Sequence, residues 1–149
     1  MTDIAFYHLE RSPLETALPQ LLEKTLEAEK RALVLATSDA RVEALAEMLW
    51  AYKADSWLPH GTAKDGFSDQ QPVWVSTLDE NPNDATFIFL TDGATSDHVE
   101  QFQRCFEMFD GNDPDAVAAA RGRWKIYKDA GHTLAYWQQT ATGGWSKKG

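Results

Sequence analysis

The sequence predicts an α/β fold in which helices cover a mostly parallel β-sheet. Short apolar runs, each long enough for one strand, recur along the chain, and longer segments with helical periodicity separate them. The run at residues 32–36 is apolar throughout, which is typical of a strand covered on both faces. Strands that alternate with helices in this way form parallel sheets with helical crossovers.

The first part of the chain contains one strand and one helix. Residues Asp3–Leu9 alternate weakly and are rich in aromatic side chains, which predicts a strand. Capping-box spacing beginning at Ser12 allows a helical turn there, but Pro19 would then lie in the helix interior. With Thr16 as the N-cap, Pro19 falls in the first turn, and the sequence then predicts a helix over residues 16–30. Its buried side chains are expected to be Leu18, Leu21, Leu22 and Leu26.

The remaining elements follow from the same patterns. Residues 37–39 supply N-cap chemistry ahead of a second helix. The buried face of that helix is expected to consist of Val42, Leu45, Leu49 and Tyr52. Residues 54–71 are rich in turn formers and are expected to form a loop. Later strands are expected at residues 73–77, 86–90, 104–109 and 133–138, and a long helix at residues 113–130.

The chain is expected to be one domain, because 149 residues suffice for a sizeable core and no repeat or linker divides them. This domain covers residues 1–141, and residues 142–149 are expected to be a flexible basic tail. No apolar run reaches the roughly 20 residues of a membrane helix. Without a signal-type N-terminus, and with Cys105 as its one cysteine, the chain is expected to be cytoplasmic.

The net charge of -9 argues against direct DNA binding, because an acidic surface repels a phosphate backbone. Little binding to bare single-stranded DNA is therefore expected at physiological salt. A nucleic-acid-binding module stays as an alternative, and it predicts binding with a steep salt dependence.

Motifs of catalytic α/β proteins are missing from the sequence. Such folds often bind nucleotides at the carboxyl ends of their strands, yet neither phosphate-loop motif occurs and the turn at residues 36–39 has no glycine. Asp92 follows an apolar strand, as a magnesium-binding aspartate does, and leaves a nucleotide-binding enzyme of Rossmann-like fold as an alternative; a turn residue is the simpler interpretation. The four histidines lack metal-ligand spacing, and Cys105 is most simply a buried small residue. We expect no catalysis, no metal and no cofactor.

Two groups of residues suggest binding surfaces. In the expected helix at residues 113–130, Arg121, Lys125 and Lys128 fall within roughly 60° of one another, and Trp124 borders them. Cations beside an indole suit an acidic peptide with an apolar end. A solvated helix face, with cations complementing the helix dipole, explains the pattern equally well. The opposite side, expected to face the core, comprises Ala116, Ala119, Ile126, Tyr127 and Ala130.

The second group contains two tryptophans near a proline turn. Trp50 lies about 80–100° from the buried stripe of its helix, so it is expected to be partly exposed. Trp57 lies in the following loop, beside Pro59 and His60. Such residues often form an interaction patch, although Trp57 could instead fold back over the sheet.

The same residues carry a resemblance to a known family. Across nearly its whole length the chain resembles the chi subunit of bacterial DNA polymerase III. The matching segments are Phe6-Tyr7, Leu49-Trp50, Trp57-Leu58-Pro59-His60 and residues 120–131, which read Ala-Arg-x-Arg-Trp-Lys-x-Tyr-Lys-x-Ala-Gly. Their order and spacing together carry the resemblance.

The resemblance implies a Rossmann-like, three-layer α/β/α fold without enzymatic activity. It implies an accessory subunit of the polymerase holoenzyme that binds the acidic C-terminal tail of single-stranded DNA-binding protein, which ends in Pro-Phe, and links it to the clamp loader. The tail-binding motif falls on Arg121, Trp124 and Lys125, and Lys128 keeps a basic side chain at its position. Trp124 stands where a tyrosine is familiar, and Val117 where a lysine can occur.

A second contact surface is implied for the psi subunit, or for a helicase in its place. This surface falls on Trp50, Trp57, Pro59 and His60. Trp57 stands where a phenylalanine is familiar, and Gly61 where an asparagine is. The expected partners are therefore replication proteins, with neither tight DNA binding nor a membrane.

Overall fold

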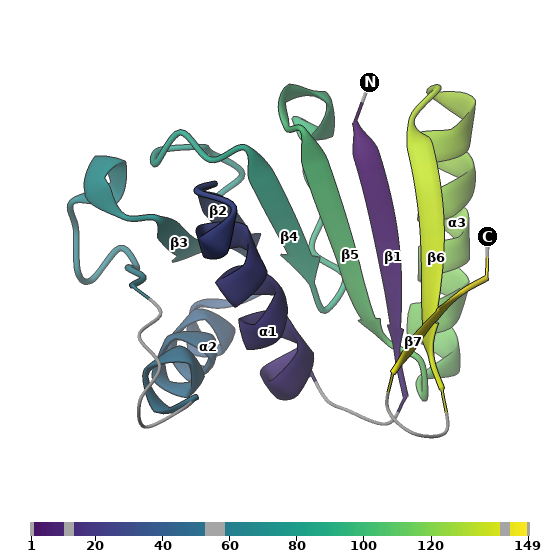
Figure 1. The fold of residues 1–149 in the computed structure, drawn as a ribbon, viewed down its shortest axis with the longest axis horizontal. Coiled ribbons are helices and arrows are strands. Elements are labelled where there is room, and N and C mark those ends of the chain that lie inside the picture. The colour runs from purple at the N-terminus through teal and green to yellow at the C-terminus, as the bar shows by residue number, and fades with distance from the viewer. Residues whose placement is uncertain (1, 11–13, 53–58, 141–143, 149) are drawn as a thin grey trace.

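The computed structural model describes residues 2–10, 14–52, 59–140 and 144–148. Within them, strands and helices are interspersed along the chain (Figure 1). In chain order the elements are β1 (Asp3–Leu9), α1 (Leu14–Glu27), β2 (Ala32–Leu35), α2 (Asp39–Ala51), β3 (Val73–Ser76), β4 (Phe87–Thr91), β5 (Arg104–Asp110), α3 (Pro114–Asp129), β6 (Thr133–Gln139) and β7 (Trp145–Lys147). No helix among the described residues is long and apolar enough to cross a membrane.

The strands form one sheet in the order β3-β2-β4-β5-β1-β6-β7. All neighbouring strands are parallel except β7, which runs antiparallel to β6. Helices α1 and α2 pack on one face and α3 on the other; Figure 1 shows α3 behind the sheet. The predicted class, a three-layer α/β/α fold with a mostly parallel sheet, is confirmed.

The central strands are covered on both faces. Every residue of β2 and β4 is buried, which explains why these strands are apolar throughout. The expected stripe of α2 is confirmed, because Val42, Leu45 and Leu49 are buried and Tyr52 packs partly buried beside them. Ser38 caps α2 by accepting a hydrogen bond from the amide of Arg41 at 3.1 Å.

The start of α1 differs from the sequence-based expectation. The helix begins at Leu14 rather than after Thr16, and Pro19 lies inside it, so the expected Thr16 N-cap is wrong. Leu14 is 5% exposed and joins the core one turn before Leu18. Burying a leucine side chain stabilises by about 1.5–3 kcal/mol, which offsets a proline cost of about 3 kcal/mol in a helix interior.

The C-terminal segment adds an edge strand. Of residues 142–149, where the sequence predicts a tail, the structure describes residues 144–148, and Trp145–Lys147 form β7. Trp145 packs edge-on against Tyr7, with ring centroids 5.0 Å apart. This aromatic contact stabilises the pairing of an otherwise polar segment with the sheet.

The carboxyl ends of β1 and β5 lie side by side, and the connections from them diverge. The chain from β1 passes to the face covered by α1, and the chain from β5 to the face covered by α3. Ligands of open α/β sheets bind in the crevice at such a switch point. The chemistry of this crevice therefore bears on the nucleotide-binding alternative.

Candidate functional site

Helix α3 positions the predicted basic residues. The Asp113 side chain caps it by accepting a hydrogen bond from the amide of Asp115 at 3.0 Å, and Pro114 occupies the first position. The helix ends before Gly131, whose φ of +90° costs a glycine no strain. The helix predicted at residues 113–130 therefore forms, shorter by one residue at each end.

The side of α3 that faces the sheet agrees with the sequence-based prediction at Tyr127 but differs from it at most other positions. Its packed residues are Val117, Ala120, Trp124 and Tyr127. Of the five residues expected there, Ala119, Ile126 and Ala130 are exposed, Ile126 at 66%. Trp124 explains this rotation, because its ring packs edge-on against Phe6 with centroids 5.2 Å apart.

A buried ion pair fixes the same rotation. Nε of Arg123 donates to Oε2 of Glu107 at 2.8 Å, and the Tyr127 hydroxyl donates to the same oxygen at 2.9 Å. Glu107 on β5 is 1% exposed; burial raises the pKa of its carboxyl, and the Arg123 guanidinium opposes that rise. From the sequence, neither Glu107 nor Arg123 is assigned a role. The available signal was the position of Glu107 between apolar residues of a strand, because a buried carboxylate needs a partner.

The basic face of α3 consists of Arg121, Lys125 and Lys128, which are all exposed. Helical spacing places them on one side, while Arg123 points toward the sheet. In the part of the chain that the structure describes, none of the three is paired with a carboxylate. Trp124 borders the basic face but is half-buried, so only part of its ring is open to a ligand.

Strand β6 supplies a second aromatic side chain at this border. The Tyr136 ring centroid lies 5.9 Å from that of Trp124. Burial raises the pKa of the Tyr136 hydroxyl, and the nearby charge of Arg121 opposes that rise. Nothing in the sequence relates positions 121 and 136; the packing of α3 on the sheet brings them together.

His8 lies beside Tyr136 near the carboxyl end of β1. Its Nδ1 is 2.6 Å from the Tyr136 hydroxyl oxygen, and the residue is 9% exposed. Its Nε2 lies 2.9 Å from Oε1 of Glu10, off the line of a well-formed hydrogen bond. The same Glu10 oxygen accepts a hydrogen bond from Nε2 of Gln138 at 3.0 Å. A polar network thus runs from the end of β1 to the border of the basic face.

Gly111 leaves room for the His8 ring. Its amide donates to the carbonyl of Leu9 at 2.7 Å, and a Cβ at this position would overlap the imidazole. We expect Gly111→Ala to lower the free energy of unfolding by about 1–3 kcal/mol, because the ring or the turn must shift. Urea unfolding measures the change.

The matched control is Gly122→Ala, where no atom lies within 4 Å of the added Cβ. In a helix this substitution is expected to stabilise, by about 0.5–1 kcal/mol. If Gly111→Ala were as stable as the parent, His8 would not lie where the structure places it.

The second candidate surface centres on Trp50, which is 63% exposed at the end of α2, as the sequence predicts. Its ring lies 4.6 Å from the ring of His60. His60 is 5% exposed, and its Nε2 lies 3.1 Å from the carbonyl oxygen of Ala46. The buried His60 ring therefore packs against the inner side of the exposed Trp50 ring. Pro59 is half-buried, and Trp57 lies outside the described residues.

Replacing Trp50 with alanine is expected to leave the fold intact, changing the free energy of unfolding by about 1 kcal/mol or less, because the ring is mostly solvated. If Trp50 anchors a partner, the same change should reduce the binding free energy for that partner by about 2 kcal/mol, which is a roughly thirty-fold loss of affinity. Phe67→Ala removes another exposed aromatic side chain, at 70%, and serves as the control in a pull-down. Equal capture by both variants would remove Trp50 from the interface.

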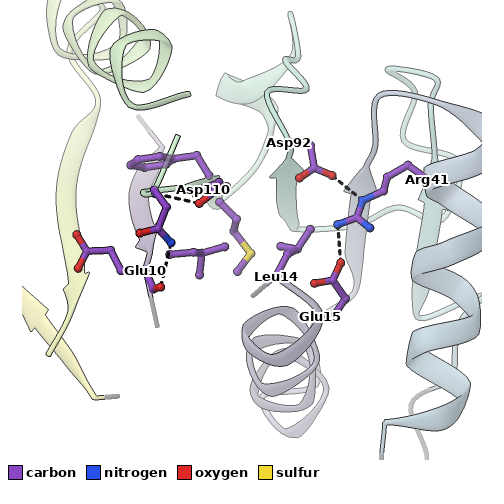
Figure 2. A pocket seen from close by; sticks show the side chains of 10 residues that line it. Glu10, Leu14, Glu15, Arg41, Asp92 and Asp110 are labelled. Carbon is purple, nitrogen blue, oxygen red and sulfur yellow. Dashed lines mark hydrogen bonds and ion pairs between the residues drawn. The ribbon is translucent and has the colours of Figure 1, made fainter. Parts of the chain in front are cut away.

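A pocket of about 390 Å³ lies at the switch point (Figure 2). Its charged lining comprises Glu10, Glu15, Arg41, Asp92 and Asp110. Figure 2 shows Arg41 between two carboxylates: its Nε donates to Oδ2 of Asp92 at 2.7 Å, and its Nη2 donates to Oε1 of Glu15 at 2.8 Å. The one guanidinium in this lining is thus neutralised, and the carboxylates oppose a phosphate.

Asp92 is accounted for by this ion pair. It has φ +53°, which aspartate tolerates better than most residues, and directly follows β4. No group of three metal-binding side chains occurs among the described residues. Cys105 is fully buried, as the sequence predicts, and burial raises the pKa of its thiol well above the usual value.

Comparison with known proteins determines the family. The family model described as "DNA polymerase III chi subunit, HolC" matches residues 1–135. The chain belongs to this chi family. A curated relative in Rickettsia prowazekii (strain Madrid E), named probable DNA polymerase III subunit chi, is 26% identical over 110 residues, which cover 72% of this chain and 67% of the relative. The chi family match spans α3 and Trp50, whereas Tyr136 lies one residue beyond it.

Proposed function

We propose that this chain is a non-catalytic accessory subunit that binds the acidic C-terminal tail of single-stranded DNA-binding protein through the basic face of α3. The observation that carries the proposal is the unpaired state of Arg121, Lys125 and Lys128 among the described residues, in a chain whose net charge is -9. Such a cluster attracts an acidic ligand in spite of the overall charge. Membership of the chi family supports a role for this binding in the DNA polymerase III assembly.

The chemistry of the basic face suits a peptide with a carboxylate end. Arg121 holds a carboxylate with two parallel hydrogen bonds, which a lysine cannot do. Lys125 and Lys128 add charge along the same side of the helix. The terminal phenylalanine ring packs on the open part of Trp124 and on Tyr136, whose centroids are 5.9 Å apart.

A second partner is proposed at Trp50, with support from His60. Pro59 and Trp57, the latter outside the described residues, are assigned to the same proposed surface. The psi subunit, or a helicase in its place, is the expected partner at this surface. Through that partner, this chain connects single-stranded DNA-binding protein to the clamp loader in the cytoplasm. An exposed tryptophan that packs against a buried ring is typical of an interface anchor.

Fluorescence anisotropy tests the first proposal. A labelled peptide with several aspartates and a terminal Pro-Phe carboxylate should bind the parent protein, and binding should weaken as salt rises. A control peptide with the same aspartates and an amidated end, without the phenylalanine, should bind at least ten-fold more weakly. Equal affinity for the two peptides would reject the proposed recognition.

Two alternatives predict other ligands. A nucleotide-binding enzyme of Rossmann-like fold predicts tight binding of ATP, GTP or NAD in calorimetry, and the carboxylates around Arg41 disfavour it. A nucleic-acid-binding module predicts salt-dependent binding to bare single-stranded DNA. We expect neither ligand to bind tightly at physiological salt.

A further inference from the structure

A buried histidine lies next to the proposed peptide site. His8 comes from β1, Tyr136 from β6 and Trp124 from α3, and their side chains meet between α3 and the sheet. Among the described residues, the Tyr136 hydroxyl forms its hydrogen bond with Nδ1 of His8, at 2.6 Å. The direction of that hydrogen bond depends on the protonation of His8.

Neutral His8 accepts from Tyr136. The Nε2 atom faces Oε1 of Glu10 at 2.9 Å, and a bare nitrogen there would oppose the carboxylate lone pairs. Glu10 therefore favours the tautomer with hydrogen on Nε2, which leaves Nδ1 as an acceptor. In this state the Tyr136 hydroxyl donates its proton inward.

Protonated His8 donates to Tyr136. One proton taken from solvent occupies Nδ1, which then donates to the Tyr136 hydroxyl oxygen, while Nε2–H stays beside Glu10. The hydroxyl hydrogen is released from His8 and can turn outward, toward Arg121. A carboxylate held by Arg121 is the acceptor for which that position is suited.

We propose that Tyr136 is a further ligand-binding residue of the basic face, and that its hydroxyl donates to a carboxylate of the bound acidic peptide when His8 takes up a proton. The inference rests on the proposed function and names a group that α3 alone does not provide. Peptide binding is then linked to the uptake of one proton, because each event favours the other.

The charged and titratable groups around His8 support this linkage. Glu10, on the same strand, attracts the protonated ring at 2.9 Å. From β6 the facing groups are Tyr136 and the neutral Gln138, which also holds Glu10. From β5 the neighbour is the uncharged ring of Phe109, 5.3 Å away, and from α3 the charge near Tyr136 is Arg121. The peptide carboxylates offset the repulsion between Arg121 and protonated His8.

Calorimetry in two buffers of different ionisation enthalpy measures proton uptake directly. We expect the parent protein to take up about a quarter to a half of a proton per peptide, averaged between pH 6 and pH 8, and to bind the peptide about three- to ten-fold more tightly at pH 6 than at pH 8. Peptide carboxylates stay ionised across this range, so they contribute little. No proton uptake by the parent would overturn the inference without any variant.

Substitutions assign the proton and the hydroxyl. Tyr136→Phe should weaken binding at pH 6 by about five-fold and remove most of the pH dependence, as should His8→Asn. The control is His98→Asn, at an exposed histidine paired with Asp79, which should keep the full pH dependence. Circular dichroism shows whether each variant is folded, and the parent measurement stands if His8→Asn is not.

The outcomes separate this inference from the proposed function. If Arg121→Ala weakens the peptide while Tyr136→Phe binds with the parent's affinity and pH dependence, the basic face is right and the role of Tyr136 is wrong. If Arg121→Ala also leaves binding unchanged, the proposed peptide site itself is wrong.

Discussion

Arg121→Ala is expected to weaken binding of the acidic, phenylalanine-terminated peptide five- to fifty-fold, or about 1–2.3 kcal/mol. The guanidinium is exposed and without a carboxylate partner among the described residues, so its substitution removes ligand contacts and no internal ones. Fluorescence anisotropy measures the change, with circular dichroism as the control for folding. Lys24→Ala, an exposed cation on α1 across the sheet, is the matched variant and should bind as the parent does.

Charge reversal at Lys125 should weaken peptide binding more than Arg121→Ala does. It should also make the affinity less dependent on salt concentration, because the electrostatic attraction that salt screens is itself reduced. Both variants should keep the parent's fold, since this side of α3 faces solvent. If both variants are folded and bind the peptide with the parent's affinity, the basic face is only a solvated helix surface and not the peptide site.

Glu107→Ala is expected to lower the free energy of unfolding by roughly 3–5 kcal/mol, because it leaves Arg123 in the core without its carboxylate. Arg123 donates to Glu107 at 2.8 Å, and Tyr127 loses its acceptor as well. Urea unfolding at neutral pH measures the loss. Glu100→Ala, at an exposed glutamate, is the control and should change stability by less than about 0.5 kcal/mol.

A double variant separates charge from packing at this position. Glu107→Leu with Arg123→Met replaces both charges by apolar groups and should be more stable than Glu107→Ala, since no charge is left unpaired. If the double variant lost as much stability as the single one, the ion pair would not explain the cost.

Much of the fold could be predicted from local patterns. Apolar runs located β2 and β4 because strands covered on both faces admit little else, and the helix expected at residues 113–130 formed as α3. The start of α1 could not be predicted from Pro19, because the burial of Leu14 outweighs the local penalty. Strand β7 depends on the contact between Trp145 and Tyr7, which no local pattern encodes.

The candidate site was predictable where it lies on one helix. The spacing of Arg121, Lys125 and Lys128 sufficed to place them together, because helical geometry alone determines it. The rotation of α3 was not predictable in this way. Apolar periodicity favours Ile126 as a core residue, whereas the ring of Trp124 and the charge of Arg123 take the positions against the sheet.

Residues on other elements could not be found from spacing. Tyr136 and His8 reach the border of the basic face only because β1 and β6 are neighbours in the sheet and α3 packs across them. Their relation depends on sheet order, which one sequence specifies only through the whole fold.

Chemical-shift mapping of the acidic peptide on the ¹⁵N-labelled protein tests the central claim most directly. Titration with the phenylalanine-terminated peptide should shift the amides of α3 around residues 117–128 and those of β6 around Tyr136, while the amides near Trp50 and Asp92 stay in place. Shifts confined to the Trp50 surface or to the pocket around Arg41, or none at saturating peptide, would contradict the account.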